Sequence, residues 1–338
     1  MSWTLLTDRS VNLRYLVLKH IMGSDEADEL EKHREEDPFV KELLGLQNPD
    51  GSWDASAIAG NAPIGSVQIT SQALTRLGFL EFDQDHPAVR RGVEYLFNKQ
   101  EQDGSWALGN YRTDADAQDN YDTMSIQTSL PLMGIAMTGH ADDPRAETAY
   151  DWLTEQRLED GAWPTGIASG VYGYVAGYRR LAHSRWGCRS NTTAALTALS
   201  LHKERSKGEE ARRALDLLLG RETREKHLIG FETARSVGAE DSTGFLTYYA
   251  RYDLAHILKL CTRLGASLED PRVEELSQFV IDQRGENGLW GYNSKHQASK
   301  WVTYDLLRTL NDLGKDANWT GSEPRTPFQP YPVRRKRF

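Results

Sequence analysis

Acidic side chains that could supply a proton gather in one polar stretch of the chain. Asp114 and Asp116 are followed closely by Asp119 and Asp122. Neighbouring negative charges and burial both raise the pKa of a carboxyl group, so one member of such a cluster can remain protonated and act as an acid. In a second interpretation, Asp122 and Thr123 cap the following helix while the other acids are solvated in a loop. Asp119 and Asp122 are therefore catalytic candidates, and both interpretations stay open.

A further acid, Asp253, lies one helical turn before His256 and follows an aromatic stretch that contains Tyr249 and Tyr252. A carboxyl group beside tyrosines can donate a proton or stabilise a cation. An Asp–His pair on a helix can equally be a polar contact that is satisfied within the fold. Asp253 is thus the third catalytic candidate.

Aromatic residues gather near the starts of several predicted helices. Ring faces attract cations, and an apolar wall excludes the water that would quench a carbocation. The alternative is that these rings simply fill the centre of the fold. The aromatic residues predicted to bind substrate are Tyr121, Tyr174, Tyr178, Trp186, Tyr249, Tyr252 and Trp301.

Arginines accompany the aromatic residues of the long connection 170–187. Arg179, Arg180, Arg185 and Arg189 could hold a diphosphate, because guanidinium groups bind phosphate oxygens in pairs. Pairing with surface acids is the alternative, since 49 Asp and Glu residues exceed 40 Lys and Arg residues. Arg185 is the basic residue predicted to contact substrate. We expect no cofactor, except Mg²⁺ if the substrate is a diphosphate.

The composition excludes several classes of function. A formal net charge of −9 argues against a partner held by a basic surface, such as duplex nucleic acid. Cys188 and Cys261 are too few for a disulfide framework and lack the spacing of a zinc site, so no metal site is predicted. No run reaches the roughly 18 apolar residues of a membrane span, and charges interrupt the N-terminal region where a signal peptide would be apolar. We expect a cytoplasmic protein without a transmembrane segment, for which peripheral membrane contact stays open.

A short motif that ends in tryptophan recurs along the chain. Gln47–Trp53 and Gln100–Trp106 read Gln-x3-Gly-x-Trp, and Gln156–Trp163 and Gln283–Trp290 carry one extra residue. A degenerate fifth copy places Phe231 in the aromatic position. A glutamine and an indole at the end of one helix can bond and stack onto the turn into the next helix. We therefore expect these tryptophans to fasten neighbouring helical hairpins rather than to contact substrate.

Each tryptophan motif follows a helix whose start is marked in the sequence. A capping Asp or His is followed by a proline in the first helical position at Asp37–Pro38, His86–Pro87, Asp143–Pro144 and Asp270–Pro271. These pairs predict outer helices. Segments rich in Ala, Ser, Thr and Leu predict inner helices that pack on more than one side, the first lying around residues 11–22. Glycines are predicted to cap four inner helices, at Gly78, Gly134, Gly265 and Gly314.

Six inner and five outer helices are counted in this way, which predicts an all-α fold. About six helical hairpins at a regular angle would close into a ring, an α/α toroid. An open array would expose two apolar ends, and the terminal repeats show no polar capping unit. We predict a single toroid domain over residues 1–320, followed by an extended, Pro-rich and basic tail over residues 321–338.

The Gln-x3-Gly-x-Trp pattern resembles the QW repeats of squalene-hopene cyclases and related prenyltransferase-like proteins. The resemblance extends over residues 35–315. Residues 185–187 resemble a cyclase repeat entry, and residues 243–256 are similar to an aromatic stretch near the cyclase C-terminus. The resemblance implies a terpenoid cyclase and protein prenyltransferase-like toroid. It also implies a class II terpene cyclase, in the isomerase or lyase class, that protonates a polyprenyl or prenyl diphosphate substrate and guides a carbocation in a central apolar cavity.

One departure from the family pattern leaves alternatives open. The family donates its proton from a D-x-D-D-T motif, whereas the nearest stretch here runs from Asp119 to Thr123 and has Tyr121 in the donor position. Such cyclases also have two toroids, and this chain has room for one. The alternatives are a non-catalytic toroid that binds a lipid or protein partner, and an enzyme of the same fold with different chemistry.

Overall fold

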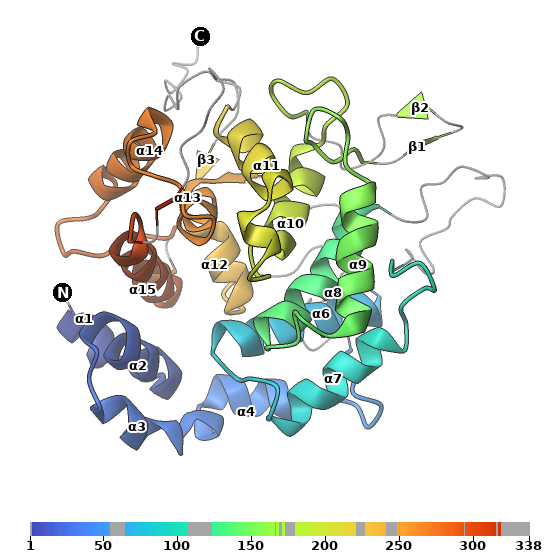
Figure 1. Cartoon of the computed structure of the whole chain (residues 1–338). Coiled ribbons are helices and arrows are strands. Elements are labelled where there is room, and N and C mark those ends of the chain that lie inside the picture. The colour runs from blue at the N-terminus through green and yellow to red at the C-terminus, as the bar shows by residue number, and fades with distance from the viewer. Residues whose placement is uncertain are drawn as a thin grey trace, which may run out of the picture.

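The computed structural model of the 338-residue chain describes residues 2–54, 65–106, 124–165, 167–168, 171–172, 180–220, 227–240, 249, 251–293, 295–315 and 317–318. Helices dominate this part of the chain (Figure 1). The predicted tail lies outside the described residues, as do the sequence-predicted candidates Asp114, Asp116, Asp119, Tyr121, Asp122, Tyr174, Tyr178 and Arg179.

The outer helices begin where the capping residues predict. The side chains of Asp37, His86, Asp143 and Asp270 each accept a hydrogen bond from the backbone N–H two residues later, and a proline follows each of them. The prediction of these helix starts is confirmed. The outer helices are α4 (Pro38–Gly45), α7 (Pro87–Phe97), α9 (Pro144–Glu155), α11 (Glu209–Leu219) and α14 (Pro271–Asp282).

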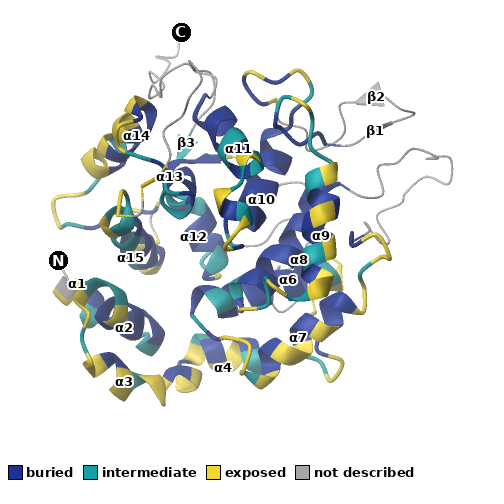
Figure 2. Cartoon of the chain, in the orientation of Figure 1, coloured by how far each residue is buried: buried dark blue, intermediate teal, exposed yellow. Residues whose placement is uncertain are grey.

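The inner helices are α6 (Ser66–Phe79), α8 (Ser125–Met137), α10 (Arg189–Leu199), α13 (Leu254–Arg263) and α15 (His296–Asp312). Residues of α6, α8 and α10 are buried along almost the whole of each helix (Figure 2). Packing on more than one side is thus confirmed. Each of the pairs α6–α7, α8–α9, α10–α11 and α13–α14 is in contact, as a helical hairpin requires.

Contacts between the inner helices lead around a cycle. α6 packs on α8, α8 on α10, and α13 on α15. The Thr197 hydroxyl and His256 Nε2 join α10 to α13 at 2.9 Å. The Phe79 ring of α6 meets Trp301 of α15 edge-on, with ring centroids 6.1 Å apart, and so brings the cycle back to α6.

The N-terminal helices depart from the predicted hairpin pattern. They are α1 (Ser2–Leu6), α2 (Val11–Val17) with its π-helical continuation η1 (Leu18–Met22), α3 (Glu26–Glu31) and the 3₁₀ turn η2 (Arg34–Glu36). Within the described residues α2 packs on α1, α3 and α15. Asp37 links α2 to α4, because its carboxylate caps α4 and also accepts from the Ser10 hydroxyl (2.6 Å) and the Asn12 N–H (3.3 Å). The starts of α2 and α4 therefore meet, and the described residues contain five inner helices where six were predicted.

Two of the four predicted glycine caps are wrong. Gly78 and Gly134 lie inside α6 and α8 and not at their ends. A Cβ on Gly78 would lie 2.6 Å from the Cβ of Met137, and one on Gly134 would lie 2.8 Å from the Ser71 carbonyl oxygen. These glycines therefore let α6 and α8 approach closely. The caps predicted after α13 and α15 are confirmed by the positive φ of Gly265 and Gly314.

The tryptophan motifs fasten neighbouring hairpins, as predicted. Each indole N–H donates to a backbone carbonyl of the preceding outer helix, at Leu43, Leu96, Leu153 and Val280. Each tryptophan backbone N–H donates to a threonine hydroxyl of the following inner helix, at Thr70, Thr128, Thr192 and Thr303. In the first two motifs the glutamine amide also donates to the first turn of the next outer helix, from Gln47 to the Ala88 carbonyl and from Gln100 to the Arg145 carbonyl.

The predicted fifth motif is absent, because Phe231 is the first residue of helix α12 (Phe231–Ser236). α12 contacts both α6 and α15 and lies among the inner helices (Figure 1). Strand β3 (His227–Leu228) pairs in parallel with β4 (Tyr252–Asp253), which brings the start of α12 beside the start of α13. The remaining elements are β1 (Ile167–Ala168), its antiparallel partner β2 (Val171–Tyr172), and the 3₁₀ turn η4 (Arg205–Lys207). Among the described helices, none is long and apolar enough to span a bilayer.

Candidate functional site

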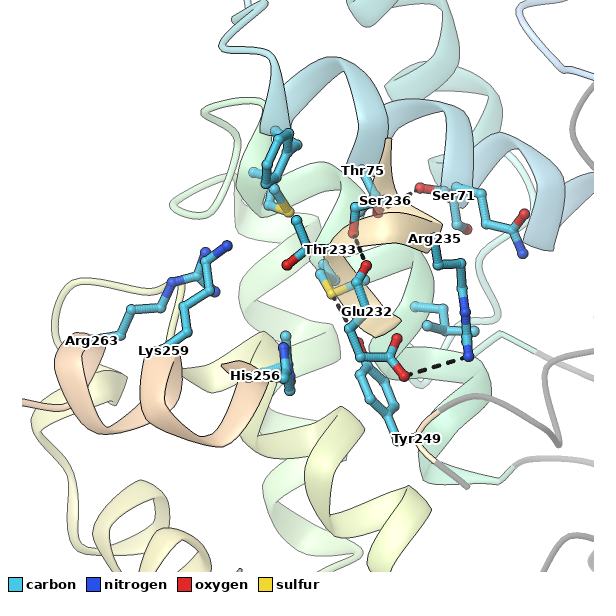
Figure 3. A pocket seen from close by; sticks show the side chains of 16 residues that line it. Ser71, Thr75, Glu232, Thr233, Arg235, Ser236, Tyr249, His256, Lys259 and Arg263 are labelled. Carbon is cyan, nitrogen blue, oxygen red and sulfur yellow. Dashed lines mark hydrogen bonds and ion pairs between the residues drawn. The ribbon is translucent and has the colours of Figure 1, made fainter. Parts of the chain in front are cut away.

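A cavity of about 50 Å³ lies at the centre of the fold, between α6, α8, α10, α12 and α13 (Figure 3). Its apolar wall consists of Leu130, Met133 and Met137 from α8. Among the described lining residues, Phe79 and Tyr249 supply the aromatic rings. The other walls carry hydroxyl, amide and charged groups, so the centre is more polar than the aromatic cavity expected from the sequence.

Among the described lining residues, Glu232 of α12 is the acidic one. Its side chain is buried, with 7% exposure of the residue, and Figure 3 shows it between Arg235 and His256. Burial raises the pKa of the Glu232 carboxyl to about 7, although the Arg235 guanidinium, 3.4 Å away, lowers it. Near neutral pH a large fraction of this carboxyl is therefore protonated and able to act as an acid.

Asp253 holds α12 in place. Its carboxylate accepts hydrogen bonds from the backbone N–H groups of Gly230 (2.9 Å), Glu232 (2.7 Å) and Ala255 (3.1 Å), and so caps the starts of α12 and α13 together. Burial raises the pKa of Asp253, and these backbone bonds lower it. The described cavity lining does not include Asp253. This predicted catalytic residue thus positions the backbone of Glu232.

His256 and Tyr249 form a stacked pair at the cavity. Their ring centroids lie 5.2 Å apart at an interplanar angle of 29°. Burial, together with the charges of Lys259 and Arg263, lowers the pKa of His256 to about 3, so its imidazole is neutral. Tyr249 has a φ of 52°, in a region that non-glycine residues seldom adopt and that often marks functional sites. It is the one described residue of the predicted aromatic set that lines this cavity.

An ion pair at the cavity wall joins α13 to α15, and Lys259 is one of the lining residues. Lys259 Nζ lies 2.5 Å from Asp305 of α15, whose other oxygen accepts from the Thr233 hydroxyl at 2.7 Å. Although burial disfavours its charge, the Lys259 ammonium holds the pKa of Asp305 below its usual range. Arg263 lies one turn beyond Lys259 and also lines the cavity. These contacts fix α12 against α13 and α15.

The other described candidates lie away from the central cavity. Trp301 lines a second, more open hollow of about 530 Å³, together with Phe39 and Val237. Tyr252 is buried and its hydroxyl donates to the Leu218 carbonyl. Near the start of α10, the exposed Arg185 lies over the half-buried Trp186 ring, 5.1 Å from its centroid.

One described group of side chains has the composition of a metal site. Oxygens of Asp142 and Glu147 lie 3.4 and 2.7 Å from His202 Nε2. His202 Nδ1, however, accepts from the backbone N–H groups of Glu204 and Arg205, which leaves the ring proton on Nε2. A metal at Nε2 would need that proton on Nδ1. Since Arg205 also pairs with Glu147 at 2.5 Å, the group fits an ion-pair network and not a metal site.

Glu232 was missed by sequence reasoning because its segment was interpreted as a degenerate tryptophan motif. The residues Gly230 to Ser236 carry no pattern of a catalytic site. The one available signal was the break in the repeat itself, at the place where a glutamine and a tryptophan were expected.

The geometry defines a helical fold of repeated hairpins around a cavity that holds a buried acid. A family model described as the squalene-hopene cyclase C-terminal domain matches residues 62–253. This is more than half of the chain, and the protein belongs to that family.

Curated relatives agree with this family. The chain is 29% identical over 133 residues to squalene–hopene cyclase of Zymomonas mobilis, covering 39% of this chain and 20% of that protein. It is 27% identical over 137 residues to lanosterol synthase of Pneumocystis carinii, covering 40% and 18%. The matched stretch thus spans about a fifth of the length of these relatives.

Among solved structures, the type II terpene cyclase MstE from Scytonema is similar at 15% identity, with a TM-score of 0.34 over 80% of this chain and 95% of that one. A structure of its R337A variant with geranylgeranyl dihydroxybenzoate as substrate matches with a TM-score of 0.35 at the same identity, over 81% and 95%.

Proposed function

We propose that this protein is a class II isoprenoid cyclase in which Glu232 donates the initiating proton. The observation that carries the proposal is a buried carboxyl group that lines the central cavity, with a pKa raised by burial to about 7. Family membership supplies the reaction class. The substrate is an apolar isoprenoid, and the proposed acid replaces the missing D-x-D-D motif.

The proposed reaction balances with the groups at the cavity. The O–H bond of Glu232 breaks as its proton forms a C–H bond with one carbon of an alkene, and the other carbon becomes a cation. Arg235, 3.4 Å away, stabilises the carboxylate that remains. The ring faces of Phe79 and Tyr249 stabilise the carbocation while a second double bond supplies the electrons of the new ring. Loss of a proton or addition of water then ends the reaction.

The size of the cavity adds a requirement. About 50 Å³ has room for only a few water molecules, so a whole isoprenoid chain must displace side chains of the wall. Met133 and Met137 suit this movement, because methionine is unbranched and has three rotatable bonds. We therefore expect the apolar wall of α8 to yield when substrate binds.

Turnover of squalene, geranylgeraniol and geranylgeranyl diphosphate, with products separated by gas chromatography and mass spectrometry, tests the proposal. Glu232→Gln should lower turnover by at least about 100-fold, the usual contribution of a general acid. In the parent protein, turnover should fall as pH rises above about 7, because only the protonated carboxyl can donate. Glu275→Gln, an exposed substitution on α14, is the matched control and should be neutral.

Asp119→Asn and Asp122→Asn distinguish this acid from the sequence-predicted one. Normal turnover in Glu232→Gln, combined with loss in Asp122→Asn, would move the proton donor to the acidic cluster. Ligand binding without product in the parent protein would favour the second candidate function, a toroid that binds an isoprenoid without converting it. The absence of a D-x-D-D motif from the sequence is the observation that favours this second candidate.

A further inference from the structure

Gln72 of α6 has hydrogen-bonding capacity that the described residues leave unused. The residue is buried, with 8% exposure, and lines the central cavity. Neither its amide nitrogen nor its amide oxygen has a hydrogen-bond partner there. Leaving a buried polar group unpaired is costly, and such groups are rare in folded proteins. The described residues therefore supply no hydrogen-bond partner for the amide of Gln72.

Three other glutamines among the described residues have hydrogen-bond partners. Gln127 on the neighbouring helix α8 accepts the backbone N–H of Met124 at 2.6 Å. Gln47 and Gln100 each donate to two backbone carbonyls. Gln72 differs from these three glutamines in that both polar atoms of its amide lack a hydrogen-bond partner among the described residues.

Glu232, on another element, lines the same cavity, and its Oε1 lies 3.4 Å from the Arg235 guanidinium. Glu232 Oε1 accepts no hydrogen bond from the described residues. A ligand group beside Gln72 would meet an N–H donor and a C=O acceptor from its amide. An ether or epoxide oxygen can only accept, and would leave the Gln72 oxygen unpaired. A hydroxyl or carboxylic acid group both donates and accepts, and satisfies the amide.

We propose that the cavity binds the hydroxyl or carboxylic acid group of an oxygenated isoprenoid, with Gln72 as the residue that recognises this group. The proposal rests on the proposed function for the isoprenoid part of the ligand. The volume of about 50 Å³ matches a few heavy atoms, which is the size of such a group and not of a whole chain. The neighbouring Leu130 and Met133 provide an apolar surface for the first carbons of the chain.

Binding measurements with one chain and varied end groups test this recognition. The ligands are geranylgeraniol, its methyl ether, geranylgeranoic acid and the corresponding hydrocarbon, with the farnesyl series in parallel. Dissociation constants come from isothermal titration calorimetry of the full chain, with every ligand in the same detergent. The alcohol should bind roughly tenfold more tightly than its methyl ether, because one buried hydrogen bond distinguishes them. Tighter binding of geranylgeranoic acid than of geranylgeraniol would identify the carboxyl group as the preferred end group.

Gln72→Leu should remove the preference of the alcohol over the ether and leave the affinity for the hydrocarbon unchanged or higher. Gln278→Leu makes the same chemical change on the exposed face of α14 and should keep the preference. Equal affinities for all four ligands in the parent protein would overturn the proposal, since water alone would then satisfy the amide. A preference that persists in Gln72→Leu would also overturn it.

The outcome is separable from that of the proposed function. Glu232→Gln abolishes turnover if the acid is correct, but it keeps Gln72 and should keep a preference for the alcohol. A preference without any product would sustain the recognition proposal and reject the cyclase. Formation of product without a preference for the alcohol would sustain the cyclase proposal and reject the recognition proposal. If Gln72→Leu does not fold, the comparison of alcohol and ether in the parent protein decides alone.

Discussion

The tryptophan motifs and the central cavity combine aromatic and polar side chains in opposite ways. In the four motifs, every indole N–H and every tryptophan backbone N–H donates a hydrogen bond. At the cavity, Gln72 and Glu232 carry buried polar atoms without hydrogen-bond partners among the described residues. Satisfied groups hold the hairpins together, while unsatisfied groups are available to a ligand. The difference separates residues that stabilise the fold from residues that can act on a substrate.

The site arises where the repeat is broken. Helix α12 stands in the place of a fifth tryptophan motif and inserts Glu232 and Arg235 among the inner helices. Asp253 secures this insertion through the backbone of Gly230 and Glu232. A regular repeat would have provided another satisfied motif here. The irregular segment instead provides an acid.

The largest expected effect belongs to the motifs. Trp163 is fully buried, and its indole donates to the Leu153 carbonyl at 2.6 Å. Trp163→Ala should lower the free energy of unfolding by about 3 to 5 kcal/mol, because it opens a large cavity and leaves that carbonyl without its donor. Urea denaturation followed by circular dichroism measures it. Trp186→Ala, at a half-buried tryptophan outside the motifs, is the control and should cost about 1 kcal/mol or less. Equal losses would erase the distinction between the two sets of tryptophans.

Replacing Glu232 should raise the free energy of unfolding at high pH, whereas replacing a motif tryptophan lowers it. Its folded-state pKa of about 7 exceeds the ordinary value of 4.5, so the folded protein binds the proton more tightly than the unfolded chain does. The stability this gives is present below pH 4.5 and is lost as pH rises through 7. Glu232→Gln cannot ionise, so its stability relative to the parent should increase by about 2 to 3 kcal/mol between pH 5 and pH 8.

Urea denaturation at the two pH values measures this change. Glu275→Gln, at the exposed surface of α14, should shift by less than about 1 kcal/mol over the same range. If the difference in free energy of unfolding between Glu232→Gln and the parent were the same at both pH values, ionisation of the buried carboxyl would not destabilise the fold.

Local sequence rules predicted much of the fold. The Asp-Pro and His-Pro pairs placed four outer helices, since capping depends only on neighbouring residues. The tryptophan motifs predicted the joints between hairpins. Gly78 and Gly134 were misassigned because a glycine needed for close packing of two helices looks the same in sequence as a glycine that ends one.

The candidate site was far less accessible to sequence reasoning. Gln72 and Glu232 are far apart in the chain, and the fold alone brings them to one cavity. The burial that raises the pKa of Glu232 is likewise a property of packing. Of the residues chosen from the sequence, Tyr249 reaches this cavity, and Asp253 acts on it through the backbone of α12. Asp119 and Asp122 stay predictions.

The smallest expected effect tests whether the motifs are energetically equivalent. Thr128→Val removes the hydroxyl that accepts the Trp106 backbone N–H at 3.3 Å, and leaves a buried donor unpaired. We expect a loss of about 1 to 2 kcal/mol in the free energy of unfolding, and a similar loss for Thr192→Val, which acts on Trp163 in the same way. Thr75→Val is the matched control at the cavity.

The Thr75 hydroxyl donates only to the Ser71 carbonyl within its own helix. Its removal leaves no buried N–H unpaired, so Thr75→Val should cost less than about 0.5 kcal/mol. Urea denaturation of the three variants under one condition resolves these differences. If Thr75→Val lowered the free energy of unfolding as much as Thr128→Val, the side chains at the cavity would stabilise the fold as strongly as the motifs do. The Gln72 amide, which lacks hydrogen-bond partners among the described residues, would then be an isolated defect in a stabilising core, and not part of a surface kept open for a ligand.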